Sequence, residues 1–174
     1  MDRFEIEQKF KIEGPSAFRK KLKKLKAKKI RSGIERDRFF DFKNALRCRG
    51  CILRLRQKGD LEGLLTFKGP RFPGRFKKRL EAEVGISEIR MAERLLRLAG
   101  FRPVTGYAKK REEYRIGKTL VTLDYLRGPG WFLEIEGSRS GITEIRRKLG
   151  VSERQLEERS YLQIAKGIRG KYAA

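Results

Sequence analysis

Apolar and polar residues alternate strictly over residues 4–12, which predicts a β-strand rather than a helix. One face of this strand carries Glu5, Glu7, Lys9 and Lys11, and the opposite face is mainly apolar. An ordinary half-buried strand turns its charged face to water, so this stretch taken alone is typical of a surface edge strand. A sharper interpretation depends on whether other strands carry matching faces.

The alternation recurs along the chain, and the segments bounded by turn residues predict several further strands with helices between them. We expect further strands over residues 34–42, 52–58, 61–68, 77–85, 101–116, 118–127 and 131–137. Helical spacing predicts a helix over residues 15–29, whose other face is almost entirely lysine and arginine. A second helix is expected to begin after an N-cap at Ser87 and to end at Gly100, and the tail is helical with capping-box spacings at 152–155 and 160–163.

The polar positions of the strands segregate by charge. Acid-rich strands carry Glu5, Glu7, Glu81, Glu83, Asp124, Glu134 and Glu136, and base-rich strands carry Arg54, Arg56, Lys68, Lys109 and Arg111. If the sheet curls into a barrel, these faces converge on one axis. Dry burial of so many charges would cost on the order of several kcal/mol per ion, so the interior is expected to be wet and to bind a charged ligand. A polyphosphate with a divalent metal uses both signs, because Arg and Lys bind phosphoryl oxygens while carboxylates hold the cation.

Length and composition fit a single domain over residues 1–174 with a real hydrophobic core, since 39% of the residues are apolar. No apolar run approaches the ~20 residues that a membrane-spanning helix needs. The chain begins with a charged strand rather than a signal peptide, so we expect a cytoplasmic protein.

The formal net charge of +23 indicates an affinity for polyanions without identifying one. The sequence contains no histidine, which removes the commonest general base and metal ligand. A metal would therefore be held by carboxylates and would be hard, Mg²⁺ or Mn²⁺ rather than Zn²⁺. Cys48 and Cys51 have the spacing of a redox or zinc pair, but no second pair completes a zinc site, so we interpret them as part of a turn or as an occasional disulfide.

Motifs along the chain resemble those of the CYTH, or triphosphate tunnel metalloenzyme, superfamily. The order runs from the E-x-E-x-K of Glu5, Glu7 and Lys9 through F-F-D at 39–41, L-R-L-R at 53–56, L-T-F-K-G-P at 65–70, R-L-E-A-E at 79–83, K-K-R at 109–111, T-L-D at 122–124, G-W-F-L-E-I-E at 130–136 and S-Y-L at 160–162. The resemblance covers residues 2–165 and is nearest to the class IV adenylate cyclases and thiamine triphosphatase-like proteins.

The resemblance implies an α+β fold, an eight-stranded antiparallel β-barrel forming a triphosphate tunnel with helices packed outside. It implies metal-binding acids at Glu5, Glu7, Glu81, Glu83, Asp124, Glu134 and Glu136. It implies phosphate-binding residues at Lys9, Arg54, Arg56, Lys68, Arg79, Lys109 and Arg111. Among these, Glu5, Glu7, Lys9 and Asp124 would be catalytic, with Mg²⁺ or Mn²⁺ as cofactor.

Two reactions are open within this fold. A metal-activated water attacking the terminal phosphorus gives a triphosphatase, and a ribose hydroxyl attacking the α-phosphorus gives cyclic AMP and pyrophosphate. We expect a small-molecule triphosphate as partner, rather than a membrane or nucleic acid, and a homodimer is open. The alternatives are a basic nucleic-acid-binding protein that uses the lysine-rich helix, whose binding would be salt-sensitive and indifferent to Mg²⁺, and a non-catalytic polyphosphate-binding module.

Overall fold

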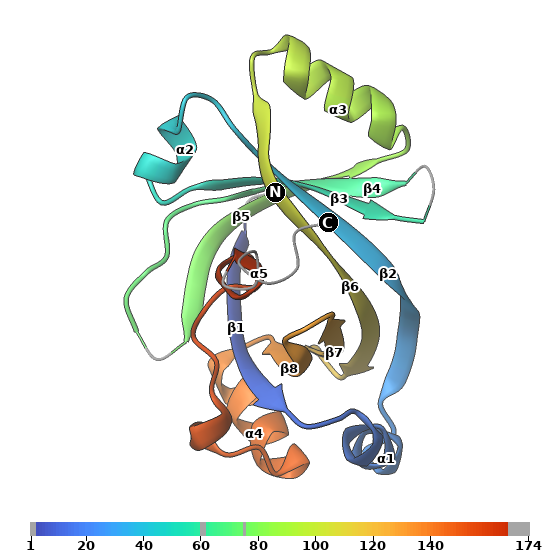
Figure 1. Ribbon diagram of the computed structural model, residues 1–174. Helices are drawn as coiled ribbons and strands as arrows, with labels where there is room; N and C mark the ends of the chain where they lie inside the picture. Colours follow the sequence, from blue (N-terminus) through green and yellow to red (C-terminus); the bar gives the residue numbers. More distant parts are fainter. Residues whose placement is uncertain (1–2, 60–61, 75, 167–174) are drawn as a thin grey trace. The chain divides into compact units, whose positions relative to one another are not determined.

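The computed structural model describes residues 3–59, 62–74 and 76–166 (Figure 1). Eight antiparallel strands form a closed barrel in the order β1-β5-β4-β3-β2-β6-β7-β8, which confirms the predicted fold class. The strands are β1 (Arg3–Ile12), β2 (Lys28–Asp41), β3 (Ile52–Lys58), β4 (Gly63–Lys68), β5 (Lys77–Ile86), β6 (Arg102–Ile116), β7 (Thr119–Leu126) and β8 (Gly130–Glu136).

Helices connect or follow the strands. In the described part of the chain these are α1 (Ser16–Lys24), α2 (Ala45–Cys48), α3 (Ile89–Leu98), α4 (Arg139–Leu149) and α5 (Tyr161–Lys166), with a 3₁₀ turn at Glu153–Gln155. None of the helices in these described ranges is both long and apolar enough to cross a membrane. The chain divides into two compact units, and the boundaries fall within β1, β2 and β6.

The first unit contains residues 33–108 together with the start of β1 up to Glu5. The buried core of this unit contains Phe40, Leu55 and Ile89. Ile89 is the buried residue of α3, so this side chain anchors the helix to the core. The carboxylate of Asp41 accepts hydrogen bonds from the backbone N–H groups of Phe42, Leu46 and Arg47, which explains the acid at the end of β2: it closes the turn into α2.

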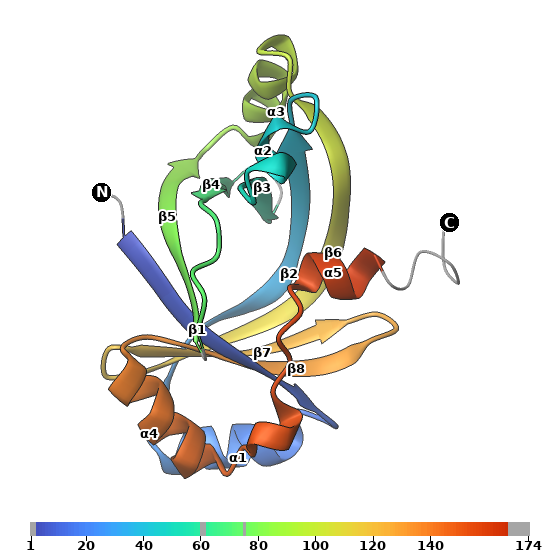
Figure 2. The same ribbon diagram turned by 90° about the vertical axis from the view of Figure 1, so that its left-hand side faces the viewer.

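The second unit contains residues 6–32 and the chain from 109 onward. Here α4 packs on β7 and β8, and α1 lies beside α4 (Figures 1 and 2). The side-chain oxygen of Ser138 accepts from the backbone of Gly141 at the start of α4. At the other end of that helix, Lys21 donates to the carbonyl oxygen of Leu149 at 2.5 Å, so a cation from α1 satisfies a terminal carbonyl of α4.

Most predicted elements are confirmed, with three differences. The helix expected over 15–29 ends at Lys24, because Lys26 has a positive φ of 53° and the chain re-extends into β2 at Lys28. Ser87 is not the N-cap of α3; Glu88 occupies that position and makes no side-chain cap hydrogen bond. The strand expected over 61–68 is observed from Gly63, and residue 61 lies outside the described residues.

Both tail capping boxes are confirmed. Ser152 and Gln155 form one around the 3₁₀ turn, and Ser160 and Gln163 exchange the same pair of hydrogen bonds at the start of α5. Both cysteines are free thiols, Cys48 exposed and Cys51 buried. The interpretation of the pair as part of a turn is consistent with their place at the end of α2 and the start of β3.

Candidate active site

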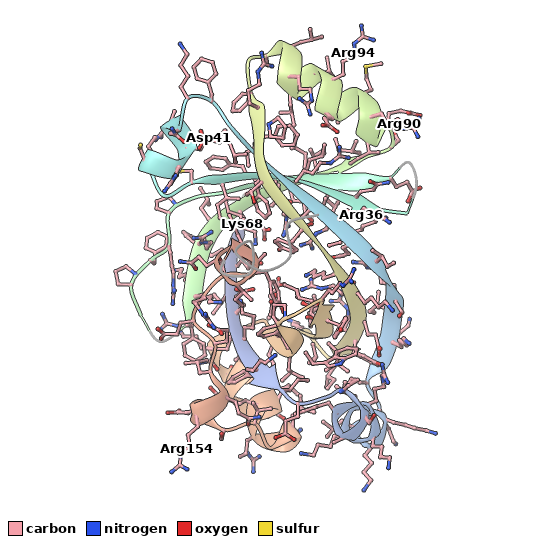
Figure 3. All side chains as sticks on the ribbon, in the orientation of Figure 1. Arg36, Asp41, Lys68, Arg90, Arg94 and Arg154 are labelled. Atoms are coloured by element: carbon pink, nitrogen blue, oxygen red, sulfur yellow. The ribbon has the colours of Figure 1, made fainter. Side chains whose placement is uncertain are left out.

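The first unit gathers carboxylates around the ammonium group of Lys68, which Figure 3 labels. Lys68 Nζ lies 2.5 Å from Glu5 Oε2 and 3.2 Å from Glu81 Oε1. The strand register explains the second contact, since Lys68 on β4 lies directly opposite Glu81 on β5. Because Glu5 and Glu81 are both buried, the two acids and the lysine stabilise one another away from bulk water. We call these three residues the Lys68 cluster.

Arg54 lies on the neighbouring strand β3 and offers a donor that the protein does not use. Its Nη2 donates to Thr66 Oγ1 at 3.1 Å and lies 3.7 Å from Glu83 Oε2. Its Nε is buried, and no hydrogen-bond acceptor for it exists among the described residues. A buried N–H without an acceptor is costly, so this atom indicates a position where a ligand oxygen would bind.

Arg56, two residues further along β3, has very different surroundings. Its Nε and Nη2 donate to the two carboxylate oxygens of Asp37 at 2.7 and 2.8 Å, and its Nη1 lies 3.1 Å from Glu35. Both acids are buried on β2. Burial, followed by the charge of Asp37, raises the pKa of Tyr107 well above its ordinary value, so Tyr107 beside this network is a neutral phenol. The guanidinium of Arg56 is therefore committed to a bidentate protein contact.

The second unit gathers cations around Asp124 on β7, whose side chain is fully buried. Arg111 on β6 lies opposite Asp124 in the register and donates from Nε to Oδ1 at 2.6 Å and from Nη2 to Oδ2. Lys109 Nζ lies 3.3 Å from the same Oδ2. Burial raises the pKa of Asp124, but the charges of Arg111 and Lys109 outweigh it and hold that pKa below its ordinary value.

Tyr161 on α5 joins this group from outside the sheet. Its hydroxyl donates to Asp124 Oδ2 at 2.7 Å, and burial raises the pKa of Tyr161 well above its ordinary value. The ring faces two ammonium groups, with Lys9 Nζ at 4.1 Å and Lys109 Nζ at 4.8 Å from its centroid. Lys9 is almost fully buried and donates to the carbonyl oxygen of Arg159. We call Lys9, Lys109, Arg111, Asp124 and Tyr161 the Asp124 cluster.

Two further acids face each other across the β1–β8 ladder of the second unit. Glu7 lies directly opposite Glu136, and Lys9 lies opposite Glu134. Residues paired in this way point to the same face of the sheet with Cβ atoms about 4.5–5.5 Å apart. Glu134 also lies 3.5 Å from Arg111, which connects this pair of strands to the Asp124 cluster.

Whether these acids could bind a divalent metal depends on how many carboxylate groups lie close enough together to coordinate it. No group of three or more Asp, Glu or Cys side chains is already arranged as a metal site within the residues that the structure describes. Mg²⁺ requires less, because it usually binds one or two protein carboxylates and completes its shell with water and substrate phosphates. The facing carboxylates of Glu7 and Glu136 supply that number with hard oxygen ligands, so the residues fit Mg²⁺ or Mn²⁺.

The structure thus brings most of the predicted site residues into two groups. Arg79 is half-buried on β5, and Glu83 is the most solvent-exposed of the predicted acids. The sequence interpretation gave no role to Thr66 or Tyr161, nor to the acids that hold Arg56. Thr66 and Tyr161 lie within the motifs at 65–70 and 160–162, so the sequence did contain a signal for these two residues. Glu35 and Asp37 alternate along the strand expected over 34–42 as Glu5 and Glu7 do along the first strand, so that alternation was the signal that could have found them.

The chain was compared with known proteins. The model of the CYTH domain family matches residues 3–161. Adenylate cyclase CyaB of Aeromonas hydrophila is 31% identical over 173 residues, which cover 91% of this chain and 87% of that protein. The MJ0240 protein of Methanocaldococcus jannaschii is 30% identical over 171 residues, 92% of this chain and 97% of its own.

Solved structures share the fold. The PH1819 protein of Pyrococcus horikoshii superposes with a TM-score of 0.76 at 31% identity, over 94% of this chain and 98% of that chain. A more distant structure, HpAC1 from Hippeastrum, has a TM-score of 0.67 at 17% identity over 99% of this chain and 98% of its own, and is described as having a dominant triphosphatase activity.

Proposed function

Because the chain belongs to the CYTH family, we propose that it is a single-domain, cytoplasmic, metal-dependent enzyme that acts on a small-molecule triphosphate. The observation that carries the proposal is the buried Nε of Arg54, a charged donor aimed at no acceptor in the described residues. A phosphoryl oxygen is the acceptor that an arginine of this kind binds best.

Each group has cations that would bind phosphate. Lys68 and Arg54 lie in the first unit, and Lys9, Lys109 and Arg111 lie in the second. Every one of them is buried or nearly so, which strengthens their attraction for phosphate because little water competes. Arg56, held by Asp37 and Glu35, would shape the site and contribute positive charge rather than reorganise to bind.

The acids would hold the divalent cation and orient the bases. Glu7 and Glu136 are the first choice as Mg²⁺ or Mn²⁺ ligands, with Glu5, Glu81, Glu83, Asp124 and Glu134 as the further predicted members of the set. When bound, the metal would polarise the phosphoryl oxygens and lower the pKa of the attacking hydroxyl. Asp124 accepts from Arg111, Lys109 and Tyr161, so within the protein it fixes the directions of the two cations.

The first candidate reaction is the conversion of ATP to cyclic AMP and pyrophosphate. It is favoured because the Aeromonas hydrophila relative, 31% identical over 91% of this chain, is named an adenylate cyclase. The second candidate is hydrolysis of a triphosphate. The Hippeastrum protein shares only the fold with this chain, and its described triphosphatase activity means that the fold alone does not choose between the reactions.

Product identification tests the proposal. Purified protein is incubated with ATP, thiamine triphosphate or tripolyphosphate, with Mg²⁺, with Mn²⁺ or with chelator, and products are separated by chromatography. Cyclic AMP with pyrophosphate establishes the cyclase, and orthophosphate with a diphosphate or pyrophosphate establishes the triphosphatase. Failure to turn over any triphosphate, at enzyme concentrations that saturate binding, would overturn the proposal in favour of a binding module.

A further inference from the structure

The strand clusters do not account for the large positive charge of the chain, because each combines acids with bases. The excess includes one segment that the proposed reaction leaves unused. Residues 14–34 contain nine lysines and arginines and no acid. This segment comprises α1, the turn after it and the start of β2.

Part of this charge has a structural purpose. Arg19 donates to the carboxylate of Glu112, and Arg31 makes the equivalent bidentate contact with Glu113. Lys21 satisfies the carbonyl oxygen of Leu149 at the end of α4. These contacts fix the segment to the second unit, where Lys29 Nζ also lies 6.0 Å from the centroid of the Tyr114 ring.

Five lysines of the segment are both exposed and unpaired. Within the described residues, their side chains form no ion pair and no hydrogen bond; they are Lys20, Lys23, Lys24, Lys26 and Lys28. We call these five residues the α1 basic surface. Arg147 on the adjacent helix α4 is likewise exposed. Like charges held this close repel one another, so a polyanion bound here would relieve an existing cost.

The apolar residues of α1 indicate which polyanion fits. Leu22 is fully buried, and Phe18 and Leu25 are half-buried. A helix that binds an anionic bilayer inserts its apolar face into the lipid, and α1 has already used that face for packing. A membrane is therefore a poor match for this surface.

The same residues distinguish double-stranded from single-stranded nucleic acid. Proteins that bind single strands stack bases on exposed aromatic rings. Phe18 is the one aromatic residue in the segment 14–34, and it is half-buried with Lys21 Nζ 5.5 Å from its ring. A surface of lysines without a stacking platform matches the phosphate backbone of a duplex.

We propose that the α1 basic surface binds the phosphate backbone of a nucleic-acid duplex, independently of base sequence and of the triphosphate site. This adds a macromolecular partner to the small-molecule partner expected from the sequence. The contacts would be ionic, so binding would weaken steeply as salt rises and would not require a divalent metal.

The test measures fluorescence anisotropy of a short labelled RNA duplex of mixed sequence over a range of KCl concentrations, with chelator present. The wild type is compared with the triple variant Lys20→Gln, Lys23→Gln, Lys24→Gln. A matched control, Arg36→Gln, Arg90→Gln, Arg94→Gln, removes the same charge from exposed positions of the first unit, which Figure 3 labels. We expect the triple lysine variant to bind at least about tenfold more weakly, and the slope of log K against log salt to fall by roughly 2–3, whereas the control keeps the wild-type slope.

Three outcomes would overturn the proposal: equal losses in the two variants, displacement of the duplex by saturating tripolyphosphate, or tighter binding to phosphatidylserine vesicles than to the duplex. Triphosphate turnover is measured in parallel on both variants. It should match the wild type, which separates this proposal from the proposed reaction and shows that the variants are folded.

Discussion

At the scale of single residues, Arg54 and Arg56 show how one strand pattern gives two environments. The two arginines are two residues apart and therefore lie on the same face of β3, and the sequence predicts a phosphate-binding role for each. In the structure Arg54 keeps a buried Nε–H without an acceptor in the described residues, whereas Arg56 is held by two buried carboxylates. Substituting each arginine by the same residue should therefore have opposite consequences.

Arg56→Gln should destabilise the protein by about 3–5 kcal/mol, because it leaves Asp37 and Glu35 buried without their cation. Arg54→Gln should cost less than about 1.5 kcal/mol but lower kcat/KM for the triphosphate by roughly 10²-fold, since a charged donor to the phosphate is lost. Urea unfolding and steady-state kinetics on both variants measure the contrast. Equal destabilisation, or full activity of Arg54→Gln, would contradict it.

At the scale of elements, α1 is attached to β6 by a contact whose strength depends on pH. Arg19 on α1 hydrogen bonds to Glu112, and this contact lowers the pKa of Glu112 below its ordinary value of 4.5. Tyr114, whose hydroxyl donates to the same carboxylate, has its pKa raised to about 12 by burial and by that hydrogen bond. The phenol stays neutral throughout the range in which Glu112 titrates.

A group with a lowered pKa in the folded state contributes stability above its unfolded pKa and loses it as the pH falls through the folded value. Amide hydrogen exchange in α1 should therefore be slow near neutral pH and, after correction for intrinsic rates, should speed up in acid. Glu112→Gln should remove this change with pH. Persistence of the same pH dependence in Glu112→Gln would show that another group holds the helix.

Prediction from the sequence succeeds for elements whose signal is local. Alternation identified the strands, and the Ser–Gln spacing identified both tail capping boxes. It missed the end of α1, because lysines and a short apolar stripe continue unchanged past Lys24 while the turn at Lys26 depends on backbone conformation. Ser87 failed as a cap because the helix begins one residue later than its position requires, at Ile89, whose side chain packs in the core.

The candidate site was predictable as a set of residues but not as a set of contacts. Counting charges on strand faces found Glu5, Lys68 and Asp124, and strand register then pairs Lys68 with Glu81 and Asp124 with Arg111. Glu35 and Asp37 alternate on one face of the strand expected over 34–42, but only the pairing of β2 with β3 places them against Arg56. Tyr161 reaches Asp124 from a helix outside the sheet, a contact that no local period predicts.

At the scale of the whole molecule, the proposal requires that a triphosphate bind the native state and not the unfolded chain. Tripolyphosphate with Mg²⁺ should then raise the unfolding midpoint. At a ligand concentration 100 times the dissociation constant, the free energy of unfolding should increase by about 2.7 kcal/mol. The triple variant Lys20→Gln, Lys23→Gln, Lys24→Gln should show the same increase, because the α1 basic surface is not needed for this ligand. An increase that disappears in that variant would mean that the ligand binds the surface lysines instead.

The proposed metal-dependent reaction requires that Glu7 and Glu136, which face each other across the β1–β8 ladder, hold the metal. Initial rates with the best triphosphate substrate are measured against Mg²⁺ and Mn²⁺ concentration for the wild type, Glu7→Gln and Glu136→Gln, with Glu144→Gln on the exposed face of α4 as the matched control. We expect no turnover in chelator, a loss of about 10²-fold in kcat/KM for Glu7→Gln and Glu136→Gln, and wild-type rates for Glu144→Gln. Turnover by the wild type in chelator, together with unchanged rates for Glu7→Gln and Glu136→Gln, would contradict the proposal.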